Sequence, residues 1–204
     1  MAAPTPQNVR VGASIKSPIA DLVPRWFDPG REDGRPRLHV GGTFPRAGWK
    51  ILNIRPGPRV DFVGDCCNLS QFEAGSVSAL YASHVLEHLG FRRALPSALA
   101  EIRRILMPGA LFLMSVPDLE VLSRLFLDER LSADERKTAL LMMFGGQLDE
   151  YDFHFVGLYR EFLGGLLFDT GFRIVHQVER LGIFPDSSDT ELCGQIISLN
   201  LVVS

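Results

Sequence analysis

Glycine and polar residues follow four short apolar segments of the chain, at positions that suit ligand binding. Such residues stand at or just after the end of each segment: Gly41-Gly42-Thr43, Asn53, Asp65 and Ser83-His84. In an open parallel sheet, the residues at the carboxyl ends of the strands line the crevice in which ligands bind. One such turn is common in any protein, but four of them in this order indicate a single binding site.

The residue types at these turns fit a cofactor that carries a nucleoside. A glycine turn lets the backbone approach the ligand closely, a polar residue such as Asn53 can hydrogen-bond ribose hydroxyls, and the Asp65 carboxylate can accept the adenine amino hydrogens. We expect Cys66 to contribute its backbone and not a reactive thiol. The predicted cofactor-binding residues are Val40, Gly41, Gly42, Thr43, Asn53, Asp65, Cys66, Ser83 and His84.

The surrounding pattern predicts an α/β fold with a largely parallel sheet, because short β-branched or aromatic segments alternate with helical ones. The predicted strands are residues 37–40, 50–54, 60–63, 77–83, 111–116, 173–178 and 195–203. The predicted helices are residues 96–107, a helix capped by Asp118 that runs to about residue 129, residues 132–144 with Ser132 and Glu135 as a capping box, and residues 159–170.

Two strands carry more specific signals. Only nine residues separate the strand that ends at Val40 from the strand that begins at Lys50, whereas a parallel crossover usually needs a dozen or more. Either the first crossover is reduced to a turn or these strands are joined in an unusual way. In the last strand, Ser198 and Asn200 alternate with apolar residues, which indicates an antiparallel strand with one face less buried.

At these residues the chain resembles class I S-adenosylmethionine-dependent methyltransferases, in particular a small bacterial group with an HVLEH motif and a short first crossover. Residues 38–42, 48–54 and 61–65 look like the first three motifs of the group. Residues 81–89 (YASHVLEHL) and 102–109 (IRRILMPG) look like the next two and are the most specific. The match extends through residues 115–118 and 144–157, so that the resemblance covers about residues 37–178.

The resemblance implies a Rossmann-like, doubly wound, mostly parallel seven-stranded sheet with the strand order 3-2-1-4-5-7-6 and an antiparallel last strand. It also implies S-adenosylmethionine as the cofactor and methyl transfer as the activity. Two positions depart from the family: the glycine turn is usually Gly-x-Gly, where this chain has Gly41-Gly42-Thr43, and the ribose position is usually an acid, where this chain has Asn53. A degenerate, non-catalytic subunit that acts as a binding or scaffold protein is therefore the alternative.

The acceptor of the methyl group is expected at the polar loop of residues 147–154, which follows the fifth strand and its helices. The predicted acceptor-binding residues are Asp118, Gln147, Tyr151 and His154. Histidine titrates near neutrality, so His154 is the candidate general base for a hydroxyl acceptor, and a structural loop histidine is the other interpretation. By association with the family, we expect a small-molecule or saccharide-type acceptor.

The histidine motif also spells H-x-x-E-H, a zinc-protease signature, over His84 to His88. That chemistry requires both histidines on one continuous helix and a third ligand. His84 comes straight from a predicted strand, so the sequence predicts no metal site here. We expect no catalytic role for His39 and His176, which lie within predicted strands.

The composition sets outer limits. The chain has 204 residues, a net charge of -3 and a sequence pI near 6.0, so it offers no general attraction to nucleic acid or to anionic membranes. The spacing of the three cysteines indicates neither a CxxC metal-binding pair nor a disulfide framework. No signal peptide or membrane span is predicted, which favours a cytoplasmic location. We divide the chain into an arm, residues 1–36, with a short element at residues 19–27, and a domain, residues 37–204. The oligomeric state cannot be read from these patterns.

Overall fold

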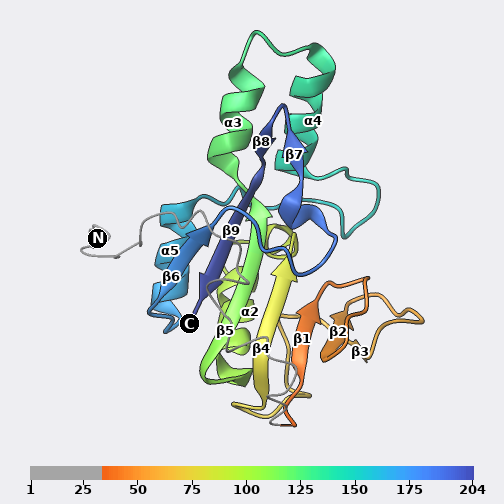
Figure 1. The fold of residues 1–204 in the computed structure, drawn as a ribbon, viewed down its shortest axis with the longest axis vertical. Helices are drawn as coiled ribbons and strands as arrows, with labels where there is room; N and C mark the ends of the chain where they lie inside the picture. Colours follow the sequence, from red (N-terminus) through yellow and green to blue (C-terminus); the bar gives the residue numbers. More distant parts are fainter. Residues whose placement is uncertain (1–33) are drawn as a thin grey trace.

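The computed structural model describes residues 34–204, and the predicted arm with its element at residues 19–27 lies almost wholly outside the described residues. Its centre is a seven-stranded sheet with the order β3-β2-β1-β4-β5-β9-β6 (Figure 1). Strands β1 to β5 pair in parallel, and β9 is antiparallel to both β5 and β6. Because β6 and β9 are the sixth and seventh predicted strands, the predicted fold class and strand order are confirmed.

The strand bounds follow the predicted segments with shifts of a few residues. The sheet contains β1 (Arg37–Val40), β2 (Trp49–Asn53), β3 (Phe62–Val63), β4 (Val77–Ser83), β5 (Leu106–Pro117), β6 (Val175–Val178) and β9 (Ser198–Val203). A separate hairpin contains β7 (Glu191–Leu192) and β8 (Gln195–Ile196). The last predicted strand is thus divided: its first two residues belong to the hairpin and its final six to the sheet.

The helices are η1 (Leu86–His88), α2 (Ala94–Ile105), α3 (Leu119–Leu127), α4 (Ala133–Phe144), α5 (Arg160–Asp169) and η2 (Ser187–Asp189). Two of the helices, α3 and α4, begin at the predicted caps. The Asp118 side chain accepts from the backbone of Glu120 and Val121, and Ser132 and Glu135 form the predicted capping box. The end of α2 was predicted wrongly, because the chain leaves the helix at Leu106, which already pairs with Val77 of β4.

The first crossover contains no helix. Eight residues, 41–48, join β1 to β2, and the two strands pair in parallel with Arg37 opposite Trp49 and Val40 opposite Leu52. The alternative of a crossover reduced to a turn is therefore the correct one.

The two faces of the sheet are covered by different kinds of structure. One face packs against α2 and α5, with Leu99, Ile102 and Leu163 fully buried among strand residues. The other face packs against the irregular segment that follows β6, through Leu181, Ile183 and Phe184. A third, smaller cluster joins α3, α4 and the hairpin beyond the carboxyl ends of the strands (Figure 1).

The segment after β6 also explains one wrong prediction. Every residue of β9 is buried, including Ser198 and Asn200, which we had expected on a less buried face. The Asn200 side chain donates to the carbonyls of Glu179 and Ser188, both from the covering segment. The polar residues of β9 therefore hydrogen-bond to backbone carbonyls of the covering segment and do not face water. In residues 34–204, no helix is long and apolar enough to cross a bilayer.

Candidate active site

A cavity of about 670 Å³ opens at the carboxyl ends of β1, β2 and β4, a volume typical of cofactor and small-molecule sites. Seven of the predicted cofactor-binding residues line it: Val40, Gly41, Thr43, Asn53, Asp65, Cys66 and His84. The loop of residues 148–152 closes its other side. The strand ends and this loop, far apart in sequence, thus form one site.

Other side chains lie close to both glycines of the first turn. Gly41 has a φ of +72°, and a Cβ there would lie 2.5 Å from the Val85 side chain. At Gly42, a Cβ would lie 2.5 Å from the His39 ring, on the opposite side of the turn. Gly42 is buried and does not line the cavity, although we had predicted it to bind the cofactor. Its smallness lets the turn lie against His39.

Asn53 lines the cavity and also holds the glycine turn. Its side-chain amide donates to the Gly42 carbonyl at 3.1 Å, and its side-chain oxygen accepts from the Arg55 backbone at 2.9 Å. An aspartate would place a carboxylate against that carbonyl and lose the donor. The departure from an acidic residue at this position therefore has a local structural reason.

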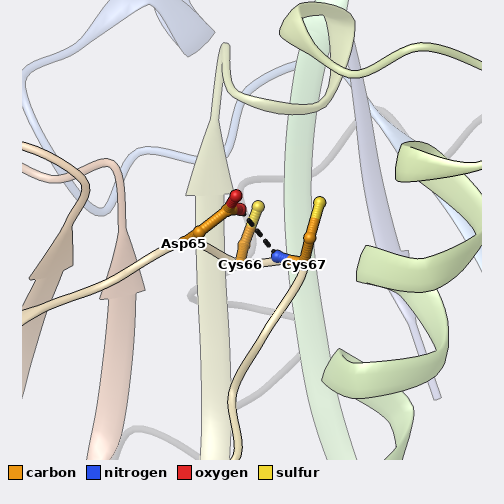
Figure 2. A group of neighbouring side chains, drawn as sticks. All are labelled: Asp65, Cys66 and Cys67. Atoms are coloured by element: carbon orange, nitrogen blue, oxygen red, sulfur yellow. Dashed lines mark hydrogen bonds between the residues drawn. The ribbon is translucent and has the colours of Figure 1, made fainter.

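Asp65, Cys66 and Cys67 follow β3, and their side chains all point toward the same end of the sheet (Figure 2). One Asp65 carboxylate oxygen accepts from the Cys67 backbone at 2.8 Å, which fixes the carboxylate at the exposed rim of the cavity. A hydrogen bond with the Cys67 thiol, together with burial, raises the pKa of the Cys66 thiol. That thiol is protonated at neutral pH, in keeping with the expectation that it is unreactive.

At the end of β4, Ser83 and His84 point into different surroundings. The Ser83 hydroxyl donates to Asp186 at 3.1 Å, on the face covered by the segment after β6, and does not line the cavity. His84 has a φ of +52°, which turns its ring toward the cavity. Burial lowers the pKa of His84 to about 4. His84 has a left-handed backbone conformation and precedes η1, which begins at Leu86, so His84 and His88 do not lie on one continuous helix.

The loop of residues 145–157 reaches across the cavity. Asp149 forms an ion pair with Arg55, whose guanidinium also lies 5.0 Å from the centre of the Tyr151 ring. The loop begins at Gly145, which has a φ of +79° and room for no Cβ, because one would lie 2.0 Å from the Asp152 carbonyl oxygen. The acceptor loop therefore has a defined turn at Gly145 and a contact to Arg55, two residues after the end of β2.

Of the four predicted acceptor-binding residues, the structure brings only Tyr151 to the cavity. Asp118 is buried as the cap of α3, and the Gln147 amide donates to the Phe144 carbonyl at 3.4 Å. His154 lies behind His88, with the ring centres 4.8 Å apart. Hydrogen bonds to nearby backbone groups occupy these three side chains, and residue type alone does not indicate such bonds.

Behind the cavity wall, Glu87 is buried with three histidines around it. It is 1% exposed, and burial raises its pKa to about 8. The nearer carboxylate oxygen lies 3.6 Å from His84 Nδ1 and 3.9 Å from His154 Nε2. His88 lines the cavity and contacts the His154 ring. Burial is also the main cause of the lowered pKa of His154.

Several residues that line the cavity were not predicted. They are Leu52, Ile54, Arg55, Gly64, Val85, His88, Leu89, Leu148, Asp149, Glu150 and Asp152. Leu52, Ile54, Arg55, Gly64 and Val85 lie within two residues of a predicted strand-end residue, so extending each strand end would have found them, whereas the rest lie in or directly after η1 or in the loop. The pairing of Arg55 with Asp149 joins residues far apart in sequence, and no local pattern indicates it.

Comparisons with known proteins agree with this geometry. A family described as a methyltransferase domain matches residues 49–114, which span β2 to the middle of β5. No curated protein sequence matches the chain. A S-adenosylmethionine-dependent methyltransferase from Archaeoglobus fulgidus has a similar structure, with a TM-score of 0.54 and 13% identity over 91% of this chain and 92% of that one.

Two carbon methyltransferases also share the fold. The CurJ carbon methyltransferase aligns with a TM-score of 0.51 and 16% identity, and the DszA carbon methyltransferase with a TM-score of 0.51 and 18% identity. Both alignments cover 91% of this chain, which spans about half the length of those chains, at 50% in each case. The methyltransferase domain and the fold support S-adenosylmethionine as the cofactor, as the sequence predicts. The chain thus has the fold of class I S-adenosylmethionine-dependent methyltransferases, and its residues 49–114 match a methyltransferase-domain family.

Proposed function

We propose that this protein transfers a methyl group from S-adenosylmethionine to a hydroxyl of a small-molecule or saccharide-type acceptor. The observation that carries the proposal is the cavity between the glycine turn and the acceptor loop of residues 145–157. A degenerate scaffold would be expected to have this cavity filled by side chains. Here both departures from the family pattern, at Thr43 and Asn53, leave it open.

The residues of the cavity fit the cofactor. Gly41 leaves its side of the turn free of a side chain, Val40 and Leu52 offer an apolar wall, and Asp65 presents a carboxylate at the rim. We assign Asp65 to the adenine amino group and Asn53 to the ribose, which it can reach while it bonds the turn. When bound, S-adenosylmethionine supplies a methyl group on a positively charged sulfur.

The acceptor side favours a polyhydroxyl compound. Asp149, Glu150 and Asp152 line the cavity beside Tyr151, and carboxylates accept hydrogen bonds from hydroxyl groups. The hydrogen bond from Arg55 lowers the pKa of Asp149, so this carboxylate is ionised at neutral pH. The loop therefore orients an acceptor mainly through hydrogen-bond acceptors.

For His154 we propose a positioning role. Its ring lies behind His88, and it reaches the cavity only through that side chain. His154→Ala should then raise the Michaelis constant for the acceptor more than it lowers turnover, whereas loss of a general base would cut turnover about 10²- to 10⁴-fold. Steady-state kinetics with the identified acceptor separates the two roles.

Calorimetric titration with S-adenosylhomocysteine tests the cofactor assignment. Asp65→Ala should weaken binding by roughly 1 to 3 kcal/mol, because it removes the partner of a polar group on the ligand. Asp65→Asn is the matched control, since it keeps an oxygen that can accept from the Cys67 backbone. Absence of binding by folded wild-type protein would overturn the proposed function. A screen of saccharides and small alcohols with isotopically labelled methyl donor then identifies the acceptor class.

A further inference from the structure

Glu87, His88 and His154 form a compact group of potential metal ligands behind the cavity wall. One ligand atom from each lies within 4.8 Å of the others. Both Glu87 carboxylate oxygens are buried and have no hydrogen-bond partner within residues 34–204. A buried carboxylate without a partner is costly, and such groups in proteins are usually paired or bound to a metal.

Hydrogen bonds fix the proton positions on the surrounding histidines. The Nδ1 atoms of His88 and His154 lie 3.1 and 3.0 Å from the backbone carbonyls of Phe153 and Met142. A carbonyl only accepts, so each Nδ1 must carry a hydrogen. In the neutral rings, the Nε2 atoms are therefore left with their lone pairs.

His84 shows the same arrangement with its nitrogens exchanged. Its Nε2 lies 2.9 Å from the Ser198 hydroxyl, which itself donates its single hydrogen to the Ser187 carbonyl. Nε2 of His84 must therefore donate, and the lone pair lies on Nδ1, the atom 3.6 Å from Glu87. In metal sites, a ligating histidine typically donates its other ring nitrogen to a nearby oxygen in this way.

The lone pairs on His84 Nδ1 and His154 Nε2 thus face the buried Glu87 carboxylate, which has no donor within the described residues, and His88 adds a third ring to the same cluster. A single proton on Glu87 could satisfy one of these nitrogens but not the others. In a tetrahedral zinc site, nitrogen and oxygen ligands about 2.0–2.1 Å from the ion lie roughly 3.3 Å from one another. Glu87 lies 3.6 Å from His84 Nδ1 and 3.9 Å from His154 Nε2, and the ligand atoms of Glu87, His88 and His154 lie within 4.8 Å of one another, so binding would draw the three ligands together by up to about 1.5 Å.

We propose that Glu87, His88 and His154 bind a divalent transition-metal ion of the zinc type, with His84 Nδ1 as the nearest candidate for a fourth ligand. This nitrogen and oxygen ligand set suits zinc and other late divalent metals. The sequence-based expectation of no metal depended on the lack of a continuous helix and of a third ligand. The fold supplies His154 from a segment 66 residues after His88.

Such an ion would fasten the acceptor loop to the end of β4. The loop already bonds this region, since the Phe155 backbone donates to the Glu87 carbonyl at 2.8 Å. His88 faces the cavity, so the ion would also fix the orientation of one cavity wall. Metal binding is measured without cofactor or acceptor, and this inference therefore does not rest on the proposed function.

Metal analysis of protein purified without chelator provides the test. We expect about one zinc per chain, loss of the metal on treatment with chelator, and binding of one equivalent when zinc chloride is titrated back. Glu87→Gln and His154→Ala should each weaken zinc binding by more than about tenfold. The matched control is His176→Ala, which removes a partly buried histidine of β6 outside the cluster and should leave zinc binding unchanged.

A second cluster, Asp65-Cys66-Cys67, could also hold an ion, and cobalt distinguishes the two (Figure 2). Cobalt(II) in the proposed site should show no thiolate charge-transfer absorption, whereas cobalt at the cysteines would. Absence of zinc binding by cooperatively folded wild-type protein would overturn the proposal and leave a protonated Glu87. Binding that survives His154→Ala but disappears in a Cys66→Ser, Cys67→Ser double variant would also overturn it. Should the histidine variants fail to fold, the wild-type titration and the cobalt spectrum still decide.

Discussion

The two sides of the cavity are built in different ways. The cofactor side consists of the ends of parallel strands, whose positions are set by sheet pairing, such as Val40 opposite Leu52. The acceptor side is one loop, residues 145–157, whose shape depends on a glycine at positive φ, an ion pair to Arg55 and a hydrogen bond to Glu87. The ends of paired strands are positioned by the regular hydrogen bonding of the sheet, whereas the residues of a loop are positioned by individual contacts. Substitutions should therefore have different consequences on the two sides.

Gly145→Ala should have the largest effect on folding. The added Cβ would meet a backbone oxygen at 2.0 Å in a left-handed conformation, so both strain and overlap oppose it. We expect a loss of roughly 3 kcal/mol in the free energy of unfolding, measured by urea denaturation. Gly182→Ala is the control for strain alone, since Gly182 has a φ of +62° and nothing within 4 Å.

The same substitution on the cofactor side sharpens the contrast. A Cβ at Gly41 would meet only the Val85 side chain, which can move, so Gly41→Ala should cost less stability than Gly145→Ala. It should instead weaken binding of S-adenosylhomocysteine, because the new methyl group and the displaced Val85 enter the cavity. Equal losses of stability in Gly41→Ala and Gly145→Ala would contradict the proposed difference between the strand-end side and the loop side of the cavity.

Acid should destabilise the cofactor side through His39, which packs beneath Gly42. Burial lowers the pKa of His39 from 6.5 to about 4, so between these values the unfolded chain binds more protons than the folded one. Stability is therefore lost as the pH falls from 6.5 to 4, by up to about 3 kcal/mol for this group. In His39→Phe, which keeps the stacking against Phe184, the slope of unfolding free energy against pH should be smaller over this range. An unchanged slope would show that His39 titrates normally.

Asn53→Asp should have a smaller effect. The substitution removes the donor to the Gly42 carbonyl and should lower the free energy of unfolding by about 1 kcal/mol. Affinity for S-adenosylhomocysteine should not rise, although an acid is the usual residue in the family that the chain resembles. A clear gain in affinity would mean that the ribose contact outweighs the support of the glycine turn.

The smallest effect on stability is expected at the ion pair of Arg55 and Asp149. Both side chains are about half exposed, at 54% and 45%, and exposed ion pairs contribute little to folding. Arg55→Ala should leave the melting temperature nearly unchanged but raise the Michaelis constant for the acceptor, because it releases the tip of the loop. The exposed control Arg130→Ala, which removes a contact to Asp128, should alter neither quantity.

The same contrast explains how far the sequence could predict the molecule. Strand positions, caps and most cofactor-side positions follow from local signals, such as glycines after a strand or Ser132 with Glu135. The strand order was implied only by the resemblance to class I methyltransferases. The acceptor side could not be read in this way. Asp118 and Gln147 are polar and well placed in sequence, but backbone groups within their own turns occupy them. The burial of Asn200 depends on the irregular segment after β6, whose path no periodic pattern indicates.

The helix-free crossover has a consequence for the order of folding. Partners in β1 and β2 lie only 12 positions apart, as Arg37 and Trp49 do, whereas Phe112 of β5 pairs with Val203 of β9, 91 positions later. Closing a short loop costs less conformational entropy, and chains with local contacts fold faster. We expect the β1–β2 pair, which carries the glycine turn, to form early. Because β9 must enter between β5 and β6, the sheet is completed only when its most distant pairing is made.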